Sequence, residues 1–401
     1  MNSLPSDAAL KKELEDLLAE SRDAAIQRES SAFDRAAGPF AQSLVLFGAG
    51  GLGRKTLKGL RQAGIEPLAF ADNNSKQWHQ VIDGLEVLPP EEAARRHGKS
   101  ATFVVTIWRA GGTHRFDKTQ AQLHQLGCER VVPAMVLFWK FAETFLDYYC
   151  VGLPHKILEE RATILQAFTW FTDATSRREY VSQIRWRLRA DFAGLGSPDR
   201  HEHYFPDDIF SLNRHEVFAD CGAFDGDSIE AFVRRQGGSF NQIVALEPDP
   251  VNFEKMTNRV ARYSDEVRRK IRLEQLGAAD FHGTLRFDAD GSLSSAANPN
   301  GALQINCVKL DDLLGGISPT YLKMDIEGAE PDALRGAVQT ITQAAPVLAI
   351  SAYHKPNHLW RIPELIKSLR ADYQLYLRPH NEECWDTVCY AVPASRVNAS
   401  N

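Results

Sequence analysis

Four polar residues in this chain each follow an apolar run that predicts a buried strand. They are Asp220, Glu247, Asp325 and His354. In open α/β sheets, ligands bind in the crevice outside the carboxyl ends of the parallel strands. We therefore expect these side chains to lie along one edge of a sheet. Carboxylates there can bind hydroxyl or cationic groups, and a histidine or carboxylate can remove a proton from an alcohol.

The loop after the first of these strands, Asp220–Ser228, indicates the kind of ligand. Gly222 and Gly226 permit a tight turn and a close approach of the backbone to a ligand. Apolar residues at helical spacing follow, and the amino terminus of the predicted helix offers N–H groups to an anion such as a carboxylate. Three acids in the loop disfavour a bound phosphate and favour a ligand with a cationic part. S-adenosylmethionine carries a sulfonium, an ammonium and a carboxylate, so it fits better than a dinucleotide. An ordinary strand-to-helix turn is the alternative.

Predicted strands and helices continue to alternate through the carboxyl-terminal half of the chain. A third strand over 271–276 is followed by small residues that leave room for a flat ring, and Asp280 there can accept from an exocyclic amine. A hairpin insertion is expected around the loop 288–301, which is a candidate lid. Two terminal strands, 373–377 and 387–392, predict an antiparallel pair at the end of a mostly parallel sheet. S-adenosylmethionine-dependent methyltransferases are built in this way.

The amino-terminal half contains a second glycine motif. A buried-strand pattern over 43–47 leads into Gly48–Gly53, which matches GxGxxG, and Asp72 follows 24 residues after the first glycine. That distance is close to the one expected for an acid that binds ribose. A weaker candidate nucleotide site therefore consists of Gly48, Gly50, Gly53 and Asp72. Because the unit is only half the size of a dinucleotide-binding domain, a scaffold or carrier role is favoured over an NAD site.

We expect four segments along the chain. Residues 1–42 are predicted to form an amphipathic helical arm, 43–140 a small Rossmann-like domain, 141–203 a mostly helical connector and 204–401 an α/β domain. The arm could join two copies of the chain into a homodimer. Packing of the arm on the neighbouring domain is the favoured interpretation.

The composition is that of an ordinary globular protein. Of the 401 residues, 44% are apolar and 24% are charged, and the net charge is −6. This balance gives no electrostatic reason to expect nucleic acid as a partner. Six scattered cysteines without a CxxC pair favour reduced thiols in a cytoplasmic protein over disulfides or a zinc site. We expect no transmembrane segment, because the most apolar stretch, 131–142, is too short to span a bilayer.

The segment Tyr204–Pro393 resembles the FkbM family of methyltransferases. The resemblance rests on five stretches, which are Val217–Ser228, Glu247–Pro250, Lys323–Glu330, Tyr353–Pro356 and Tyr376–His380. It implies the Rossmann-like sheet of class I methyltransferases and methyl transfer from S-adenosylmethionine, usually to a hydroxyl of a sugar or polyketide. Phe224 and Ser228 stand where Asn and Thr are common in the family. The amino-terminal Rossmann-like unit is outside the resemblance.

On this interpretation each candidate residue has a role. We assign the methionine end of the cofactor to the loop, the ribose to the acid after the second strand, and the adenine to the residues after the third. These residues are, in order, Asp220, Gly222, Ala223, Gly226 and Ser228; Glu247; and Ala279 and Asp280. We predict His354 as the base, with Asp325 as competitor or orienting partner. A divalent cation held by Asp325 and Glu327 ranks second, because no further carboxylate run completes the set. Lys355 and His380 are predicted to line the acceptor site.

Two other functions compete with this one. In the first, the amino-terminal unit is a scaffold that binds a nucleotide or nucleotide-sugar, and the methyltransferase domain is inactive. The joint presence of Asp220, Glu247, Asp325 and His354 argues against it. In the second, an NAD-linked sugar oxidoreductase uses the GxGxxG loop, which would require a catalytic Tyr/Lys pair or a strand-end cysteine that is not evident. The acceptor is expected to be a small molecule or glycan.

Overall fold

The computed structural model describes residues 6–109, 111–199, 201–287 and 303–398. The chain divides into two compact units. Unit 1 consists of residues 1–165, 178–198 and 381–385, and unit 2 of residues 166–177, 199–380 and 386–401. The expected arm therefore belongs to unit 1, and the expected connector, 141–203, is divided between the units. The candidate lid, 288–301, lies outside the described residues.

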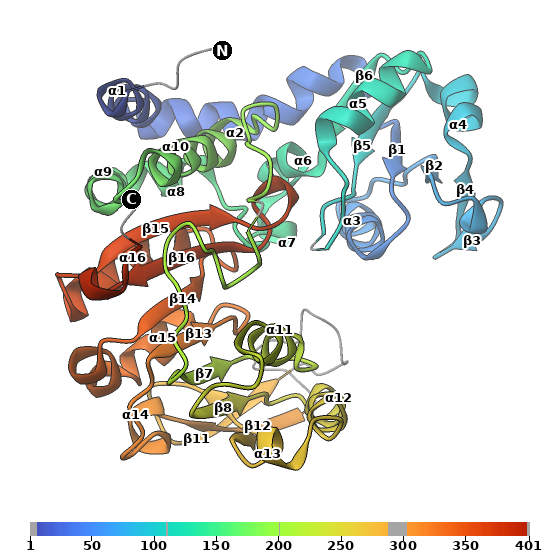
Figure 1. Ribbon diagram of the computed structural model, residues 1–401. Helices are drawn as coiled ribbons and strands as arrows, with labels where there is room; N and C mark the ends of the chain where they lie inside the picture. Colours follow the sequence, from blue (N-terminus) through green and yellow to red (C-terminus); the bar gives the residue numbers. More distant parts are fainter. Residues whose placement is uncertain (1–5, 110, 200, 288–302, 399–401) are drawn as a thin grey trace. The chain divides into compact units, whose positions relative to one another are not determined.

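Unit 1 is built on a six-stranded sheet with the order β3-β4-β2-β1-β5-β6 (Figure 1). Its strands are β1 (Leu44–Phe47), β2 (Ala69–Ala71), β3 (Val81–Ile82), β4 (Leu85–Leu88), β5 (Thr102–Val105) and β6 (Arg130–Pro133). Neighbouring strands run parallel, except for the antiparallel pair β3 and β4. Strands β1 and β5 are buried along their whole length, as expected for continuous apolar runs in a parallel sheet covered on both faces.

Helices surround this sheet and extend the unit. They are α1 (Asp7–Leu18), α2 (Arg22–Ala37), α3 (Gly51–Gln62), α4 (Pro90–His97), α5 (Phe116–Gln125), α6 (Ala134–Lys140), α7 (Ala142–Phe145) and α8 (Pro154–Glu159), whereas α9 (Arg161–Trp170) and α10 (Ala174–Arg189) have residues in both units. The apolar stripe of α1, formed by Leu10, Leu14 and Leu18, is buried. Its burial within the chain favours packing of the arm on its own unit over a role as a dimerisation surface.

Unit 2 contains a seven-stranded sheet with the order β15-β16-β14-β13-β7-β8-β9. Its strands are β7 (Val217–Cys221), β8 (Gln242–Leu246), β9 (Ile271–Glu274), β13 (Tyr321–Met324), β14 (Val347–Ser351), β15 (Gln374–Pro379) and β16 (Thr387–Val392). Neighbours run parallel from β9 to β14, and β16 pairs antiparallel with both β14 and β15. The predicted sheet with an antiparallel terminal hairpin is thus confirmed.

A separate three-stranded sheet contains the predicted insertion. It consists of β10 (Gly277–Ala278), β12 (Leu303–Val308) and β11 (Gly283–Phe287), and the last two form an antiparallel pair. The helices of unit 2 are α11 (Asp227–Gln236), α12 (Pro250–Val260), α13 (Asp265–Arg268), α14 (Leu310–Leu313), α15 (Glu330–Arg335) and α16 (His358–Leu369). Figure 1 shows α11 and α12 on one side of the large sheet, and α15 and α16 on the other. The loops at the strand ends are therefore held by a rigid frame.

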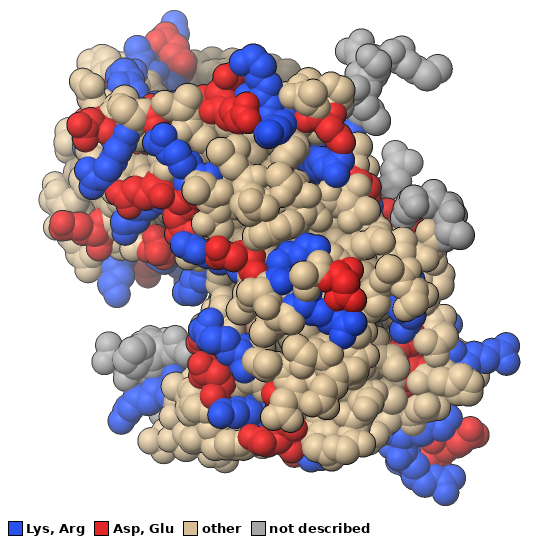
Figure 2. Space-filling view, turned by 90° about the vertical axis from the view of Figure 1, so that its left-hand side faces the viewer, with Lys and Arg blue, Asp and Glu red and all other residues tan. Residues whose placement is uncertain are grey.

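The surface and the thiols agree with the sequence. Within the described ranges, no helix combines the length and the apolar character needed to cross a membrane. Figure 2 shows basic and acidic side chains interspersed over the face that it presents. The six cysteines are free and buried. Apolar burial, which is common for free cysteine, accounts for their positions.

Candidate active site

A buried ion pair ties the glycine loop to the centre of the large sheet in unit 2. The register of β7 and β13 places Lys323 opposite Asp220, and Lys323 Nζ lies 3.0 Å from Asp220 Oδ1. The same Nζ donates to the carbonyl oxygen of Gly222 at 2.6 Å. Burial by itself would lower the pKa of Lys323, but the charges of Asp220 and Asp325 outweigh it and raise that pKa. Lys323 therefore stays charged, and its contact with Asp220 joins the two strands beneath the loop.

The loop after β7 has its shape from Gly222 and Glu247. Gly222 has a φ of +79°, and a Cβ at this position would lie 1.9 Å from the carbonyl oxygen of Asp325, so only glycine fits. Glu247 follows β8 and accepts the backbone N–H groups of Phe224 and Asp249, each at 2.9 Å. Burial raises the pKa of Glu247 to about 7. Because each carboxylate oxygen can accept a further bond, Glu247 can hold ribose hydroxyls while it supports the loop.

The other predicted cofactor residues occupy two kinds of position. Asp220 and Ser228 are 0% and 4% exposed, and the hydroxyl of Ser228 donates to Asp220 Oδ2 beneath the loop. They support the loop from within, and a contact of either residue with the methionine end of the cofactor stays a prediction. Gly226 is the amino-terminal cap of α11. After β10, Ala279 is buried, and the partly exposed Asp280 lies 3.6 Å from the Arg335 guanidinium.

The loops after β13 and β14 bring three carboxylates to one histidine. His354 Nδ1 lies 2.8 Å from Glu330 Oε1, and Nε2 lies 3.3 Å from Asp325 Oδ1 and 3.8 Å from Glu327 Oε1. The side chains of His354 and Glu330 are 1% and 0% exposed, whereas those of Asp325 and Glu327 are 23% and 22% exposed. A ligand arriving from solvent would therefore meet Asp325 and Glu327 before His354.

Further hydrogen bonds fix this cluster, which we call the acid–histidine cluster (Asp325, Glu327, Glu330 and His354). Glu330 Oε1 accepts the backbone N–H group of Ile326 at 2.9 Å, which holds the turn after β13. In that turn Glu327 has a φ of +54°, a conformation that is uncommon for residues with a side chain. The hydroxyl of Tyr204 donates to Asp325 Oδ2 at 2.6 Å. Strain that is held in place by surrounding bonds is typical of functional sites.

Burial and the charges of neighbouring groups lower the pKa of Asp325 and raise those of His354 and Glu327. Burial by itself would raise the pKa of Asp325, but the charges of His354 and Lys323 lower it to about 2. Burial by itself would lower the pKa of His354, but Glu330 and Glu327 raise it to about 10. Burial raises the pKa of Glu327 to about 8. A protonated imidazole cannot accept a proton, so the prediction of His354 as base applies to a state of the site in which that proton has left.

The two residues predicted to line the acceptor site differ in exposure. Lys355 is exposed, and its side chain passes over Gly328. His380 is half-buried, and its Nε2 lies 2.7 Å from the Tyr390 hydroxyl. Burial lowers the pKa of His380 to about 4, so this imidazole is neutral at physiological pH. A contact of either residue with an acceptor stays a prediction.

Sequence reasoning missed the roles of three residues in this region. The role of Lys323 could have been predicted from its position, because a lysine within an otherwise apolar strand needs a buried partner. Glu330 has the form of an ordinary acid in the first turn of a helix. Nothing in the sequence places Tyr204 beside Asp325, because 121 residues separate the two.

In unit 1, two of the predicted nucleotide-site residues, Asp72 and Gly53, stabilise the glycine loop. Asp72 accepts the backbone N–H groups of Ala49 and Asn74, each at 2.8 Å. A Cβ at Gly53 would lie 1.9 Å from the carbonyl oxygen of Gly48, so this glycine is required for packing between helix and strand. Gly50, by contrast, has no atom within 4 Å of its ideal Cβ position. Nucleotide binding by these four residues stays a prediction.

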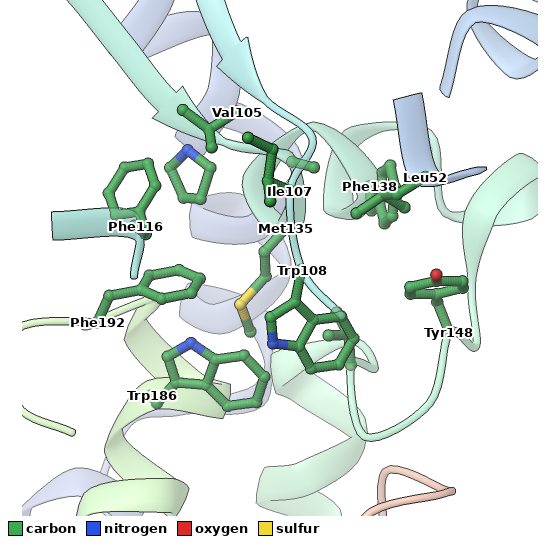
Figure 3. A pocket seen from close by; sticks show the side chains of 13 residues that line it. Leu52, Val105, Ile107, Trp108, Phe116, Met135, Phe138, Tyr148, Trp186 and Phe192 are labelled. Carbon is green, nitrogen blue, oxygen red and sulfur yellow. The ribbon is translucent and has the colours of Figure 1, made fainter. Parts of the chain in front are cut away.

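Figure 3 shows a cavity in unit 1 near the carboxyl end of β5, lined mainly by apolar and aromatic side chains. Trp108, Phe116, Trp186 and Phe192 are among them. Its volume is about 30 Å³, and a cavity needs roughly 10–15 Å³ of this kind of volume to hold one water molecule. A nicotinamide ring does not fit a cavity of this size. The chain's own aromatic rings thus line the space beyond the carboxyl end of β5.

Unit 2 has the strand order and the loop position of a class I methyltransferase. Within it, residues 220–375 match the family model described as the methyltransferase FkbM domain. The chain therefore carries an FkbM methyltransferase domain. This family match and the strand order support the methyltransferase function that we predicted.

Solved structures extend the comparison of folds. A crystal structure of methyltransferase FkbM from Methylobacillus flagellatus covers 96% of this chain and 100% of its own, with a TM-score of 0.74 and 22% identity. At this identity the likeness shows a shared fold, and its coverage includes unit 1. A precorrin-6y C5,15-methyltransferase from Geobacter metallireducens covers 46% of this chain and 84% of its own, with a TM-score of 0.29 and 15% identity. None of the curated proteins compared with the sequence matches it.

Proposed function

We propose that this protein transfers the methyl group of S-adenosylmethionine to a hydroxyl of a sugar, a glycan or a related natural product. The observation that carries the proposal is the arrangement at the carboxyl edge of the sheet in unit 2. The glycine loop and Glu247 follow two neighbouring strands, β7 and β8, and the acid–histidine cluster follows the next two, β13 and β14. A cofactor-binding half and a proton-removing half thus stand side by side.

The first half fits the chemistry of S-adenosylmethionine. Gly226 caps α11 without a side chain, and the N–H group of Ser228 donates to Asp227 Oδ1, so the other N–H groups of the first turn are those that can bind the carboxylate of the methionine part. Glu247 can bind the ribose hydroxyls, and Ala279 and Asp280 supply a small and a hydrogen-bonding residue for the adenine. When bound, the cofactor supplies a methyl group that its sulfonium has already activated.

The second half suits the removal of a proton from an alcohol. Asp325 and Glu327 are the partly exposed members of the cluster, so they face the acceptor. The acceptor oxygen bonds to the methyl carbon while the bond from that carbon to sulfur breaks, and the hydroxyl proton passes to the cluster. Within the cluster, His354 stays our predicted base. The sulfonium becomes a neutral thioether, so the charges balance.

We place the reaction in the cytoplasm, because all six cysteines are free thiols, as is usual in a reducing compartment. The NAD-linked alternative finds little support in unit 1, because the cavity near the end of β5 is too small for a nicotinamide ring. A scaffold role for unit 1 is compatible with the proposed reaction.

Cofactor binding and its pH dependence test the first half of the proposal. Calorimetric titration should show one S-adenosylmethionine site, with an affinity that rises from about pH 6 to about pH 8. The reason is that the pKa of Glu247 is raised to about 7, and its ionised form accepts stronger hydrogen bonds from ribose. Glu247→Gln should lower the affinity at the higher pH roughly tenfold and remove this pH dependence.

The exposed Glu254 on α12 provides the matched control, because Glu254→Gln changes the same kind of side chain outside the site. If neither pH nor Glu247→Gln changes the affinity for S-adenosylmethionine, the assignment of Glu247 to the ribose is wrong. Tight binding of NAD without binding of S-adenosylmethionine would contradict the proposed cofactor.

A further inference from the structure

We propose that Asp325, Glu327 and His354 bind a divalent metal ion of the Mn²⁺ or Zn²⁺ type, and that Glu330 orients His354 as its outer partner. The consequence for catalysis rests on the proposed function: an ion held here would lie where the acceptor hydroxyl meets the cluster, and it would take over from His354 the activation of that hydroxyl. The binding site itself is argued from the geometry of the cluster and from its charge.

The spacing of the donor atoms suits a shared ion. His354 Nε2 lies 3.3 Å from Asp325 Oδ1 and 3.8 Å from Glu327 Oε1. Two ligands that each lie about 2.1 Å from one ion, roughly at right angles, are about 3 Å apart. Single donor atoms of Asp325, Glu330 and His354 also all lie within 4.8 Å of one another. His354 Nε2 is therefore placed to share an ion with Asp325 Oδ1, and Glu327 Oε1 lies 3.8 Å from the same nitrogen.

The residues that hydrogen-bond to the proposed ligands are of the kind found around metal sites. Glu330 Oε1 holds the Nδ1 side of His354 at 2.8 Å, and this turns Nε2 toward Asp325 and Glu327. A histidine that binds a metal usually donates its other ring N–H to a carboxylate in this way. Tyr204 holds Asp325 Oδ2 at 2.6 Å, so Oδ1 is the oxygen that faces His354. Glu330 thus supplies the further carboxylate that the sequence pattern lacked.

The cluster gathers three carboxyl groups around one histidine. Its three carboxylates lie in a largely buried site, and their ion-pair partners are the imidazoles of His354 and His358. Buried charges in proteins are paired or bind metal ions. A second buried histidine, His358, is 3% exposed and points Nδ1 at Glu330 Oε2 from 3.4 Å. Neither of these two atoms has a hydrogen-bond partner among the described residues, so the cluster holds more polar groups than its own bonds satisfy.

A second group of acids and a histidine in unit 2 differs from the acid–histidine cluster in having an arginine partner. Asp199, His201 and Asp208 also bring possible metal-binding atoms together. There the guanidinium of Arg378 lies 3.3 Å from Asp199 Oδ2 and 2.7 Å from Asp208 Oδ2. That group already has a cation from the protein, so we expect it to bind no metal.

Titration of the metal-free, full-length protein with Mn²⁺, followed by electron paramagnetic resonance of the free ion, tests the site. We expect one bound Mn²⁺ per chain. Asp325→Asn, Glu327→Gln and His354→Gln should each weaken binding more than about 100-fold, and Glu330→Gln roughly 10- to 100-fold. His201→Ala, the matched control, should leave binding unchanged. Circular dichroism shows which variants fold, and the partly exposed Glu327 provides the variant with the least effect on packing.

Absence of Mn²⁺ binding to the folded protein would overturn the proposal, as would binding that Asp325→Asn and Glu327→Gln leave intact. These outcomes are distinct from a failure of the proposed function. Methyl transfer by a protein that does not bind Mn²⁺ would remove the metal site and leave the methyltransferase. Binding of Mn²⁺ without binding of S-adenosylmethionine would support the site and contradict the proposed cofactor.

Discussion

Asp325→Asn is expected to reduce methyl transfer about a thousandfold while it leaves the affinity for S-adenosylmethionine within about threefold. Asp325 is ionised at neutral pH, because the charges of His354 and Lys323 lower its pKa to about 2 against the opposing effect of burial. The asparagine keeps the size of the side chain and removes the charge that faces the acceptor. Transfer of labelled methyl into the acceptor fraction that the wild-type protein labels measures the loss, and calorimetry measures cofactor affinity.

Tyr204→Phe is the companion variant, because it removes the hydroxyl that donates to Asp325 Oδ2 and keeps the ring. A loss of about tenfold is expected, since one hydrogen bond that orients the carboxylate is missing. If Asp325→Asn folds, binds the cofactor and transfers methyl at the wild-type rate, the reaction does not take place at the acid–histidine cluster.

Lys323→Met is expected to lower the free energy of unfolding by about 3–5 kcal/mol. The substitution leaves the carboxylate of Asp220, which is 0% exposed, without the ammonium 3.0 Å away. It also removes the donor to the carbonyl oxygen of Gly222, so the loop loses a support. Urea unfolding followed by circular dichroism measures the change.

The double variant Asp220→Asn with Lys323→Met should recover part of this loss, because no uncompensated charge remains buried. The exposed Lys58 provides the control, since Lys58→Met is expected to change stability by less than about 0.5 kcal/mol. A Lys323→Met protein as stable as the wild type would show that the ion pair does not hold the loop.

The sequence predicts the framework of unit 2 well, because its signals are local. Apolar runs ending at Asp220, Glu247 and Asp325 become β7, β8 and β13, and the close terminal strands become an antiparallel hairpin. The contacts that define the chemistry are long-range. His354 meets Glu330 across 24 residues, and Tyr204 meets Asp325 across 121. Such contacts cannot be predicted from the types and spacing of the side chains.

The two glycine motifs also show that local sequence patterns do not reveal long-range contacts. In each unit, the acid that follows the second strand along the chain, Asp72 or Glu247, accepts a backbone N–H group of the glycine loop. Local pattern alone therefore makes the two loops look alike. They differ in what lies beyond them, because aromatic rings leave a cavity of only about 30 Å³ in unit 1, whereas the loop of unit 2 is followed by an acid–histidine cluster.

The most direct test of the proposed reaction is transfer of labelled methyl from S-adenosylmethionine into fractionated metabolites and glycans by the full-length protein. We predict label in a sugar, glycan or natural-product fraction, recovered as an O-methyl group and absent when Asp325→Asn replaces the wild-type protein. Label confined to nucleic acid or protein, or no label from a folded protein that binds the cofactor, would contradict it.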